Sequence, residues 1–304
     1  MGSEQSPADV FGLLSDETRV DILRAVAVAQ SDARSGGAPA LSFSEVYDEV
    51  DVDNTSKLSY HLGELTGTFL RKDDDGYAFT HAGEQTVRFV LAENYEQPRD
   101  FGPIPVDGDC PFCGDTDLQA RPNHQFLLVE CCECERPVTG YEIPPAQARS
   151  RDGEELIESI KQRFSSHYRL VRQGVCPRCS GRLSTTVEPI GETPLADIEG
   201  YVVTDRCEAC LRTYNAPLPY TVAYHPASVA FHWDHGLDIT SMGMWEFHRH
   251  RHEGRWTGEQ RSTDPVTYEV VLRHGEDALR ARLDDSATVT RTERVRRTGP
   301  SDRD

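Results

Sequence analysis

Eight of the nine cysteines form four Cys-x-x-Cys pairs, and these pairs restrict the fold of the chain more than any other feature. The pairs occur in two sets, and in each set a Cys-Pro-x-Cys pair is followed by a strand-like run and then by a second pair. The two pairs are separated by 17 residues in the first set and by 27 in the second, which is enough for a hairpin that brings them together. Four thiolates in two such pairs are typical of a tetrahedral zinc site. The predicted zinc ligands are Cys110, Cys113, Cys131 and Cys134 in the first set, and Cys176, Cys179, Cys207 and Cys210 in the second.

Both sets are predicted to be structural zinc ribbons, because four cysteine ligands leave no open coordination position for catalysis. Gly114 and Gly181 follow the first pair of each set and favour the tight turn of a zinc knuckle. Cys132 is predicted to be a free thiol, because Cys131 has the two-residue spacing to Cys134. Disulfides, an iron site like that of rubredoxin, and cross-pairing between the sets are the alternatives.

The first 100 residues contain no cysteine and predict a helical unit. A helix is expected from Ser15, as its N-cap, to about Ala29, followed by two short helices on either side of a polar turn at residues 51–54. The apolar positions that mark the inner faces are Val20, Leu23 and Val26, then Phe43, Val46 and Val50, then Leu58, Leu62 and Leu65. Residues 69–80 predict two strands around an Asp-Gly turn. This order predicts a helix-turn-helix followed by a wing.

The second short helix and the wing carry side chains that suit DNA. Small hydroxyls, a lysine and a tyrosine near a helix N-terminus can reach base edges and phosphates, and two adjacent bases on the wing can reach the flanking backbone. The predicted DNA contacts are Thr55, Ser56, Lys57, Ser59 and Tyr60 on the helix, and Arg71, Lys72 and Tyr77 on the wing.

The segments Phe11–Arg19, Ile22–Leu23 and Ser59–Leu62 resemble the ArsR-type winged helix of prokaryotic regulators, especially its haloarchaeal branch. The resemblance covers about residues 7–95. It implies a homodimer formed by the first and last helices, and a Ser-x-His-Leu helix that enters the major groove. The dimer contacts that it implies are Val10, Leu13, Leu14, Val87, Val90 and Leu91. This third lacks the cysteines with which arsenic- and cadmium-sensing members bind metal, so metal sensing of that kind is not expected.

The chain is strongly acidic, with 51 acidic and 32 basic residues and a net charge of −19. Only three of the basic residues are lysines, a ratio that resembles the proteomes of halophilic archaea, in which acidic surfaces keep proteins soluble in concentrated salt. A DNA-binding protein in such a cytosol depends more on base and shape contacts than on positive charge. The alternative is an acidic protein that simply avoids nucleic acid. No apolar stretch or leader predicts a membrane span or a signal peptide, so a cytoplasmic protein without a membrane partner is expected.

The C-terminal third is rich in histidines and then in strands. Histidines are dense in residues 220–252, where ordinary packing is favoured over a metal site or pH sensor because no carboxylates occur at ligand spacing. Three strands are expected at 266–273, 278–283 and 287–295, followed by a basic tail that includes Arg294 and Arg297. A small meander of this kind could form an effector pocket with the aromatic residues that precede it.

These patterns predict an α+β protein with four parts. The parts are a winged helix-turn-helix at 1–100, a zinc ribbon at 101–148, a helix at about 154–172 with a second ribbon in 149–219, and a small accessory or sensor domain of helices and a β-meander at 220–304. The expected function is that of a homodimeric, sequence-specific transcription regulator rather than an enzyme. One alternative is a general factor that contacts RNA polymerase and resembles archaeal transcription factor E. Another is a metal or redox protein that uses the histidine-rich third.

Overall fold

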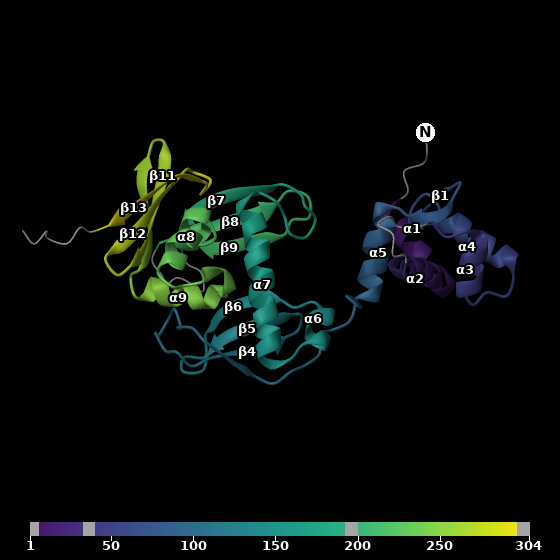
Figure 1. The fold of residues 1–304 in the computed structure, drawn as a ribbon, viewed down its shortest axis with the longest axis horizontal. Helices are drawn as coiled ribbons and strands as arrows, with labels where there is room; N and C mark the ends of the chain where they lie inside the picture. The colour runs from purple at the N-terminus through teal and green to yellow at the C-terminus, as the bar shows by residue number, and fades with distance from the viewer. Residues whose placement is uncertain (1–5, 33–39, 192–199, 297–304) are drawn as a thin grey trace, which may run out of the picture. The chain divides into compact units, whose positions relative to one another are not determined.

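The computed structural model of the protein describes residues 6–32, 40–191 and 200–296, and the chain divides into two compact units, Met1–Gln97 and Pro98–Asp304 (Figure 1). The fold is mixed α+β, with helices and four antiparallel sheets. Within the described ranges, no helix is both long enough and apolar enough to cross a membrane.

The first unit consists of short helices and one hairpin around a single core. Its elements are α1 (Pro7–Gly12), a 3-10 turn (Leu13–Ser15), α2 (Glu17–Asp32), α3 (Phe43–Glu49), α4 (Thr55–Leu65), β1 (Leu70–Asp73), β2 (Gly76–Phe79) and α5 (His81–Leu91). Side chains cap four of the helices: Ser6 forms a capping box with Asp9 at α1, Ser42 forms one with Glu45 at α3, Asn54 caps α4, and Thr80 caps α5. Polar residues before each apolar stripe therefore determine where these helices begin.

Two local expectations in the first unit are wrong by one residue each. Ser15 does not cap α2, because it lies in the preceding 3-10 turn and its hydroxyl donates to the Gly12 carbonyl at 2.7 Å. Asp16 precedes α2 instead, and its carbonyl accepts from Arg19 N at 3.1 Å. The hairpin loop is residues 74–75 rather than an Asp-Gly turn, because Gly76 already pairs with Asp73 in the β1–β2 ladder.

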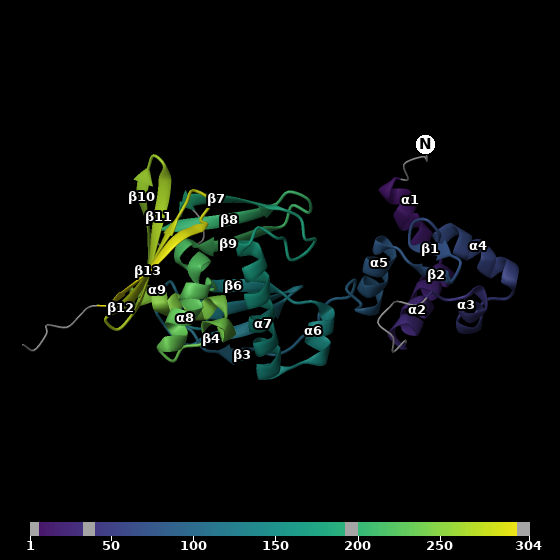
Figure 2. The same cartoon turned by 45° about the horizontal axis from the view of Figure 1, so that its top comes forward.

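The second unit contains three sheets and four α-helices in its described part (Figure 2). The first sheet has the order β3 (Ile104–Val106), β4 (Leu118–Asn123), β5 (Phe126–Cys131) and β6 (Pro137–Glu142). The second has β7 (Leu183–Pro189), β8 (Tyr201–Cys207) and β9 (Thr213–Pro217), and the third has β10 (Trp256–Thr263), β11 (Val266–His274), β12 (Asp277–Leu283) and β13 (Val289–Arg296). The helices are α6 (Pro145–Ser150), α7 (Gly153–Arg172), α8 (Pro226–Asp234) and α9 (Met244–His252).

Helix α7 joins the parts of the second unit and runs between the first and second sheets (Figures 1 and 2). Near its start, Leu156 and Ile160 pack in the core of the first sheet together with Trp245 of α9. Near its end, Tyr168 belongs to the largest core, which also contains residues of β8, α8, α9 and the third sheet. The two predicted ribbons and the predicted C-terminal domain therefore form one unit, because their hydrophobic residues are buried against each other.

The third sheet is larger than the sequence predicts. The predicted strands correspond to β11, β12 and β13, and the added strand β10 pairs with β11. Trp256, at the start of β10, is buried in the largest core. The predicted basic tail begins as part of β13, where Arg294 makes a 2.6 Å ion pair with Asp234, whereas Arg297 lies outside the described residues.

Candidate metal centres and nucleic-acid interface

The eight predicted ligands come together in two separate groups of four, as the spacing predicts. In each group the four Sγ atoms all lie within 4.8 Å of one another. Sγ–Sγ distances are 3.6 Å for Cys110–Cys134 and for Cys113–Cys131. They are 3.7 Å for Cys176–Cys210 and 3.5 Å for Cys179–Cys207. Zinc–sulfur bonds of about 2.3 Å in a tetrahedron place sulfurs about 3.8 Å apart, so both groups fit a metal ion such as zinc. The two sets do not cross-pair.

The first cysteine of each pair makes the same two backbone hydrogen bonds. These cysteines are Cys110, Cys131, Cys176 and Cys207. In each, the carbonyl accepts from the amide four residues later, at 2.8–3.1 Å, and the amide donates to the carbonyl five residues later, at 2.7–3.1 Å. This tight turn directs both sulfurs of a pair to one side. Two such turns, held face to face by a hairpin, complete each group of four.

The fourth residue after the first cysteine of each pair adopts the left-handed conformation. These residues are Gly114, Glu135, Ser180 and Leu211, with φ of 76°, 55°, 59° and 61°. Three of the four are not glycine, so the expectation that glycine provides the left-handed turn holds only for Gly114. Gly181 has another role, because a Cβ atom there would lie 3.2 Å from the Sγ atoms of both Cys179 and Cys207. The absence of a side chain lets the turn approach the sulfurs closely.

Burial and backbone amides act in opposite directions on the thiols of these two groups. Burial raises the pKa of Cys110 to about 12, so a bound cation is needed to hold it as thiolate at neutral pH. The amide of Phe112 donates to Cys110 Sγ at 3.5 Å, and the amide of Cys210 donates to Cys207 Sγ at 3.4 Å. Cys132 is exposed and lies outside both groups, and its amide donates to the Asp117 carbonyl at 2.9 Å.

The predicted DNA contacts on α4 share its exposed side. Thr55, Ser56, Lys57, Ser59 and Tyr60 are all exposed, and Tyr60 is 59% exposed. The opposite side of α4 buries its leucines completely in the core of the first unit. This division leaves one polar helix face next to a hairpin, and it follows from the 3.6-residue period of the leucines.

On the hairpin, Arg71 and Lys72 are exposed, but Tyr77 is not available as predicted. Tyr77 is only 7% exposed and packs in the core of the first unit. Its backbone exchanges hydrogen bonds with Leu41 at 2.8 and 2.9 Å, which ties β2 to the segment before α3. The carbonyl of Leu41 also leaves no room for a side chain at Gly76. Tyr77 therefore supports the hairpin from inside, with Lys72 Nζ 5.2 Å from the centre of its ring.

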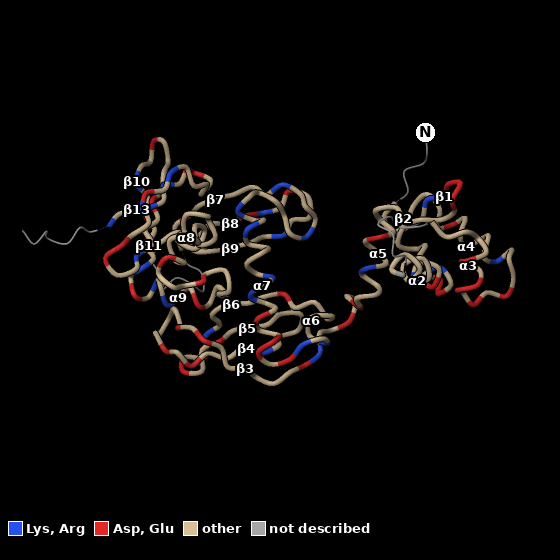
Figure 3. Tube along the Cα trace, viewed as in Figure 1, with Lys and Arg blue, Asp and Glu red and all other residues tan. Residues whose placement is uncertain are grey.

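Carboxylates of the first unit already pair with several of its exposed cations. Acidic positions also outnumber basic ones there (Figure 3). Lys57 Nζ lies 3.2 Å from Asp53, and Arg71 pairs with Asp73. Arg19 Cζ lies 5.7 Å from the ring centre of Tyr60, and its guanidinium pairs with Glu64 at 3.2 Å. The face is thus polar and close to neutral rather than strongly basic.

The predicted dimer residues divide into three groups. Val87 is fully buried in the core of its own unit and is not available to a partner. Val10, Leu13, Leu14 and Val90 are partly exposed, and Leu91 is 40% exposed. Two further apolar side chains that the sequence patterns did not predict are exposed: Phe11, 73% exposed on α1, and Phe89, 47% exposed on α5. Their exposure shows only in the structure, because both lie among other apolar residues in the sequence.

His232, His248 and His250 of the C-terminal third are buried packing residues, whereas His252 is exposed. No third group of histidine, cysteine and carboxylate side chains gathers there to hold a metal ion. His248 Nδ1 lies 2.6 Å from the hydroxyl of Tyr220, and His235 Nε2 lies 3.1 Å from Asp277. Burial lowers the pKa of His232 to about 4 and the pKa of His248 and His250 to about 3, so all three are neutral at neutral pH.

The geometry defines an α+β protein with two four-cysteine centres in a single compact unit, preceded by a small helical unit with a hairpin. A family profile described as "Domain of unknown function (DUF7351)" matches residues 107–289, which is more than half of the chain. The chain therefore belongs to this family. A second profile, described as "Domain of unknown function (DUF7347)", matches residues 7–90 and so covers the helices of the first unit. Comparisons with curated proteins and with solved structures returned no match.

Proposed function

We propose that the protein is a sequence-specific DNA-binding transcription regulator whose first unit is a winged helix-turn-helix. One observation carries the proposal. Helix α4 buries its leucines and exposes Thr55, Ser56, Lys57, Ser59 and Tyr60 together, next to a hairpin that exposes Arg71 and Lys72. A helix placed in a major groove needs this combination of a fixed inner face and a polar outer face.

In this reading, α4 enters the major groove and the hairpin contacts the flanking backbone. The hydroxyls of Ser59 and Tyr60 would read base edges, while Lys57 and Arg71 would exchange their own carboxylate partners for phosphates. Each of these ion pairs is exposed, so opening it costs less than about 1 kcal/mol. Sequence preference then comes from the helix face rather than from net positive charge.

The regulator is proposed to act as a homodimer through α1 and α5. Phe11, Phe89 and Leu91 are large apolar side chains that remain exposed on these two helices. The ring of Tyr95, which is 60% exposed, lies 6.2 Å from that of Phe89 and extends the same apolar surface. A second copy of the first unit would remove this surface from water.

Zinc is proposed to occupy both four-cysteine centres in a structural role. Each group of four thiols joins two turns at the end of a hairpin, and all four ligand positions come from the chain. Bound metal would stabilise the second unit directly, because the turns contribute few apolar residues of their own. No catalytic step is assigned to either centre.

Chromatin immunoprecipitation of the tagged protein in its native host tests the proposal. A limited set of sites that share a palindromic element is expected, with enrichment lost in the double variant Ser59→Ala/Tyr60→Ala. Ser31→Ala is the matched control, because Ser31 is an exposed helical serine on α2 that is not on the α4 face. Unchanged site preference in the double variant would refute the assignment. Occupancy of most promoters would instead support a general factor that contacts RNA polymerase.

Asp73→Asn provides a second test, in which affinity should rise. The substitution removes the carboxylate that pairs with Arg71 and one negative charge next to the phosphates, while an Asn side-chain oxygen can still accept from the amide of Asp75. We expect DNA binding to strengthen by up to about tenfold at low salt and by less at high salt. Weaker binding in a gel-shift titration would contradict the placement of the hairpin near the backbone.

A further inference from the structure

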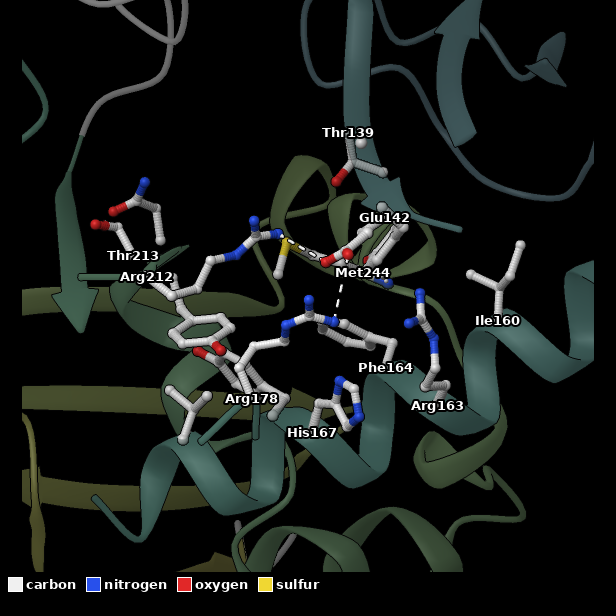
Figure 4. Close-up of a pocket in the computed structure, with 16 residues that line it drawn as sticks. Thr139, Glu142, Ile160, Arg163, Phe164, His167, Arg178, Arg212, Thr213 and Met244 are labelled. Carbon is white, nitrogen blue, oxygen red and sulfur yellow. Dashed lines mark hydrogen bonds and ion pairs between the residues drawn. The ribbon is translucent and has the colours of Figure 1, made fainter. Parts of the chain in front are cut away.

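The second unit contains a cavity of about 310 Å³ bounded by β6, by α7 and by the turns of the second four-cysteine centre (Figure 4). Glu142 and Tyr141 come from β6, whereas Arg163 and His167 come from α7. The volume is at the lower end of the range for small-molecule sites. Elements far apart in the sequence therefore form one concave site within the second unit.

The cavity concentrates positive charge in a chain whose net charge is −19. Arg163, Arg178 and Arg212 line it, and Glu142 is the single carboxylate among its lining residues. Glu142 forms ion pairs with both Arg178, at 3.4 Å, and Arg212, at 3.3 Å, as the dashed lines in Figure 4 show. Three guanidinium groups facing one carboxylate leave a net charge of +2 within the wall.

Arg163 forms no ion pair within the described residues. It is partly buried on α7, and Glu142 is the carboxylate that lies near enough to favour its charged form. Burial lowers the pKa of Arg163, because the surroundings disfavour its charge. A guanidinium in this position gains most from an anionic ligand, which it can bind through two parallel hydrogen bonds.

Aromatic rings form the apolar part of the same wall. Tyr141 and Phe164 pack edge to face with ring centres 5.1 Å apart, and Phe164 stacks on Tyr168 at 5.5 Å. Burial, together with Arg163 and Arg178, lowers the pKa of His167, so its ring is neutral at neutral pH. Arginines beside aromatic rings suit a ligand with an oxyanion at one end and a planar apolar body at the other.

The second four-cysteine centre positions two of the arginines. Arg178 lies between Cys176 and Cys179, and the carbonyl of Arg212 accepts from the amide of Cys207 at 2.8 Å. The hydroxyl of Tyr214, another lining residue, lies 3.5 Å from the Sγ atom of Cys176. A metal ion that holds these turns would therefore also hold the positive side of the cavity in place.

We propose that this cavity binds a small organic anion, with a carboxylate or phosphate held by Arg163, Arg178 and Arg212 and a planar apolar body placed against the aromatic rings. The position of the anion next to Glu142 loosens the bridge between this carboxylate and the two arginines. Binding would thus alter contacts between β6 and the second cysteine centre. Its role as an effector of transcription rests on the proposed function, whereas binding itself does not.

Isothermal titration calorimetry of the full-length, zinc-loaded protein tests the site with benzoate and phenyl phosphate as probes. At least one probe should bind, and the tighter one identifies a carboxylate or a phosphate as the anionic group. Arg163→Gln should weaken binding by about tenfold or more, as expected for the loss of a charged hydrogen-bonding partner. Arg178→Gln/Arg212→Gln should weaken it at least as much.

Arg280→Gln is the matched control, because Arg280 is exposed on β12 and is not among the lining residues of this cavity. It removes the same charge and should leave probe affinity unchanged. Failure of both probes to bind, or equal affinity for the Arg163→Gln and native proteins, would overturn the proposal. Inorganic phosphate that binds as tightly as phenyl phosphate would overturn the apolar part of the site.

A gel-shift titration of the Arg163→Gln variant separates this inference from the proposed function. Because the substitution lies in the second unit, DNA binding without added anion should match that of the native protein. Loss of probe binding with DNA binding intact supports the ligand site. Probe binding by a protein that binds no DNA would support the cavity and refute the regulator.

Discussion

His250 offers a direct test of the buried histidines in the second unit. Its ring stacks on Trp256 with centres 4.8 Å apart and an interplanar angle of 14°, and its side chain is 5% exposed. In the described structure, Nε2 has no hydrogen-bond partner, and burial lowers the pKa to about 3. His250→Phe keeps a ring on Trp256 and removes the group that can accept a proton.

The size of the expected stability loss follows from the difference between the pKa of His250 in the folded protein and its pKa in the unfolded chain. An unfolded chain protonates histidine below about pH 6.5, whereas the folded protein protonates His250 only near pH 3. Above pH 6.5 the ring of His250 is neutral in both states and the pH does not affect its share of the stability. As the pH falls from 6.5 toward 3, protonation of the unfolded chain lowers the free energy of unfolding. At pH 5, about 1.5 units below the unfolded pKa, this amounts to a loss of about 2 kcal/mol in the free energy of unfolding.

Urea unfolding at pH 7 and at pH 5, followed by tryptophan fluorescence, measures this loss. All three tryptophans lie in the second unit, so the first unit does not contribute to the fluorescence change. The native protein should lose about 2 kcal/mol more than His250→Phe between the two pH values. Effects of metal loading and of carboxylates are common to both proteins and cancel in the comparison. An equal loss in both proteins would show that His250 accepts a proton in the folded state and would refute the reasoning.

Further predictions concern the metal centres and a buried ion pair. Cys131→Ser should lower the zinc content from two ions to one per chain, while Cys132→Ser should leave it unchanged, as measured by mass spectrometry of the purified protein. Chelation of the metal should unfold the second unit and leave the helices of the first, as followed by fluorescence and circular dichroism. Arg172→Leu should cost about 3–5 kcal/mol in urea unfolding, because Asp205, which it binds at 2.9 and 3.1 Å, would remain buried without its cation. Arg294→Leu, which breaks an exposed pair, should cost less than about 1 kcal/mol, and equal losses would contradict this distinction.

Sequence patterns predicted the elements well where one physical rule dominates. The amphipathic period of residues 154–172 predicts α7 within one residue at its start, because its buried positions repeat every three or four residues. The cysteine spacing predicted both groups of four, and it predicted that Cys132 lies outside them. In the helix the residues that share a face lie close together in the sequence. In the cysteine groups only a few residue types can bind a metal ion, so the possible ligands are few.

The patterns failed where burial depends on distant segments. Tyr77 and Val87 were expected at interfaces, yet both are buried in their own unit. Strand β10 was missed because its less exposed positions after Trp256 are Gly258, Gln260 and Ser262, so the sequence shows no apolar alternation there. Only pairing with β11 and burial of Trp256 identify it as a strand. The guanidinium cluster around Glu142 was also missed, because its residues come from three separate segments.

The sequence by itself determined the local structure of this protein: which residues begin its helices, which face of α4 is apolar, and which eight sulfurs form two groups. These features follow from hydrogen bonding, periodicity and ligand chemistry over short stretches of chain. Only the tertiary structure decided that the two cysteine centres and the third sheet share one unit, and that Arg163 lines the same cavity as Arg178 and Arg212. Those outcomes depend on how α7 packs against sheets that are distant in sequence. Periodicity and spacing describe only residues that are near each other in the chain, so they do not predict this packing.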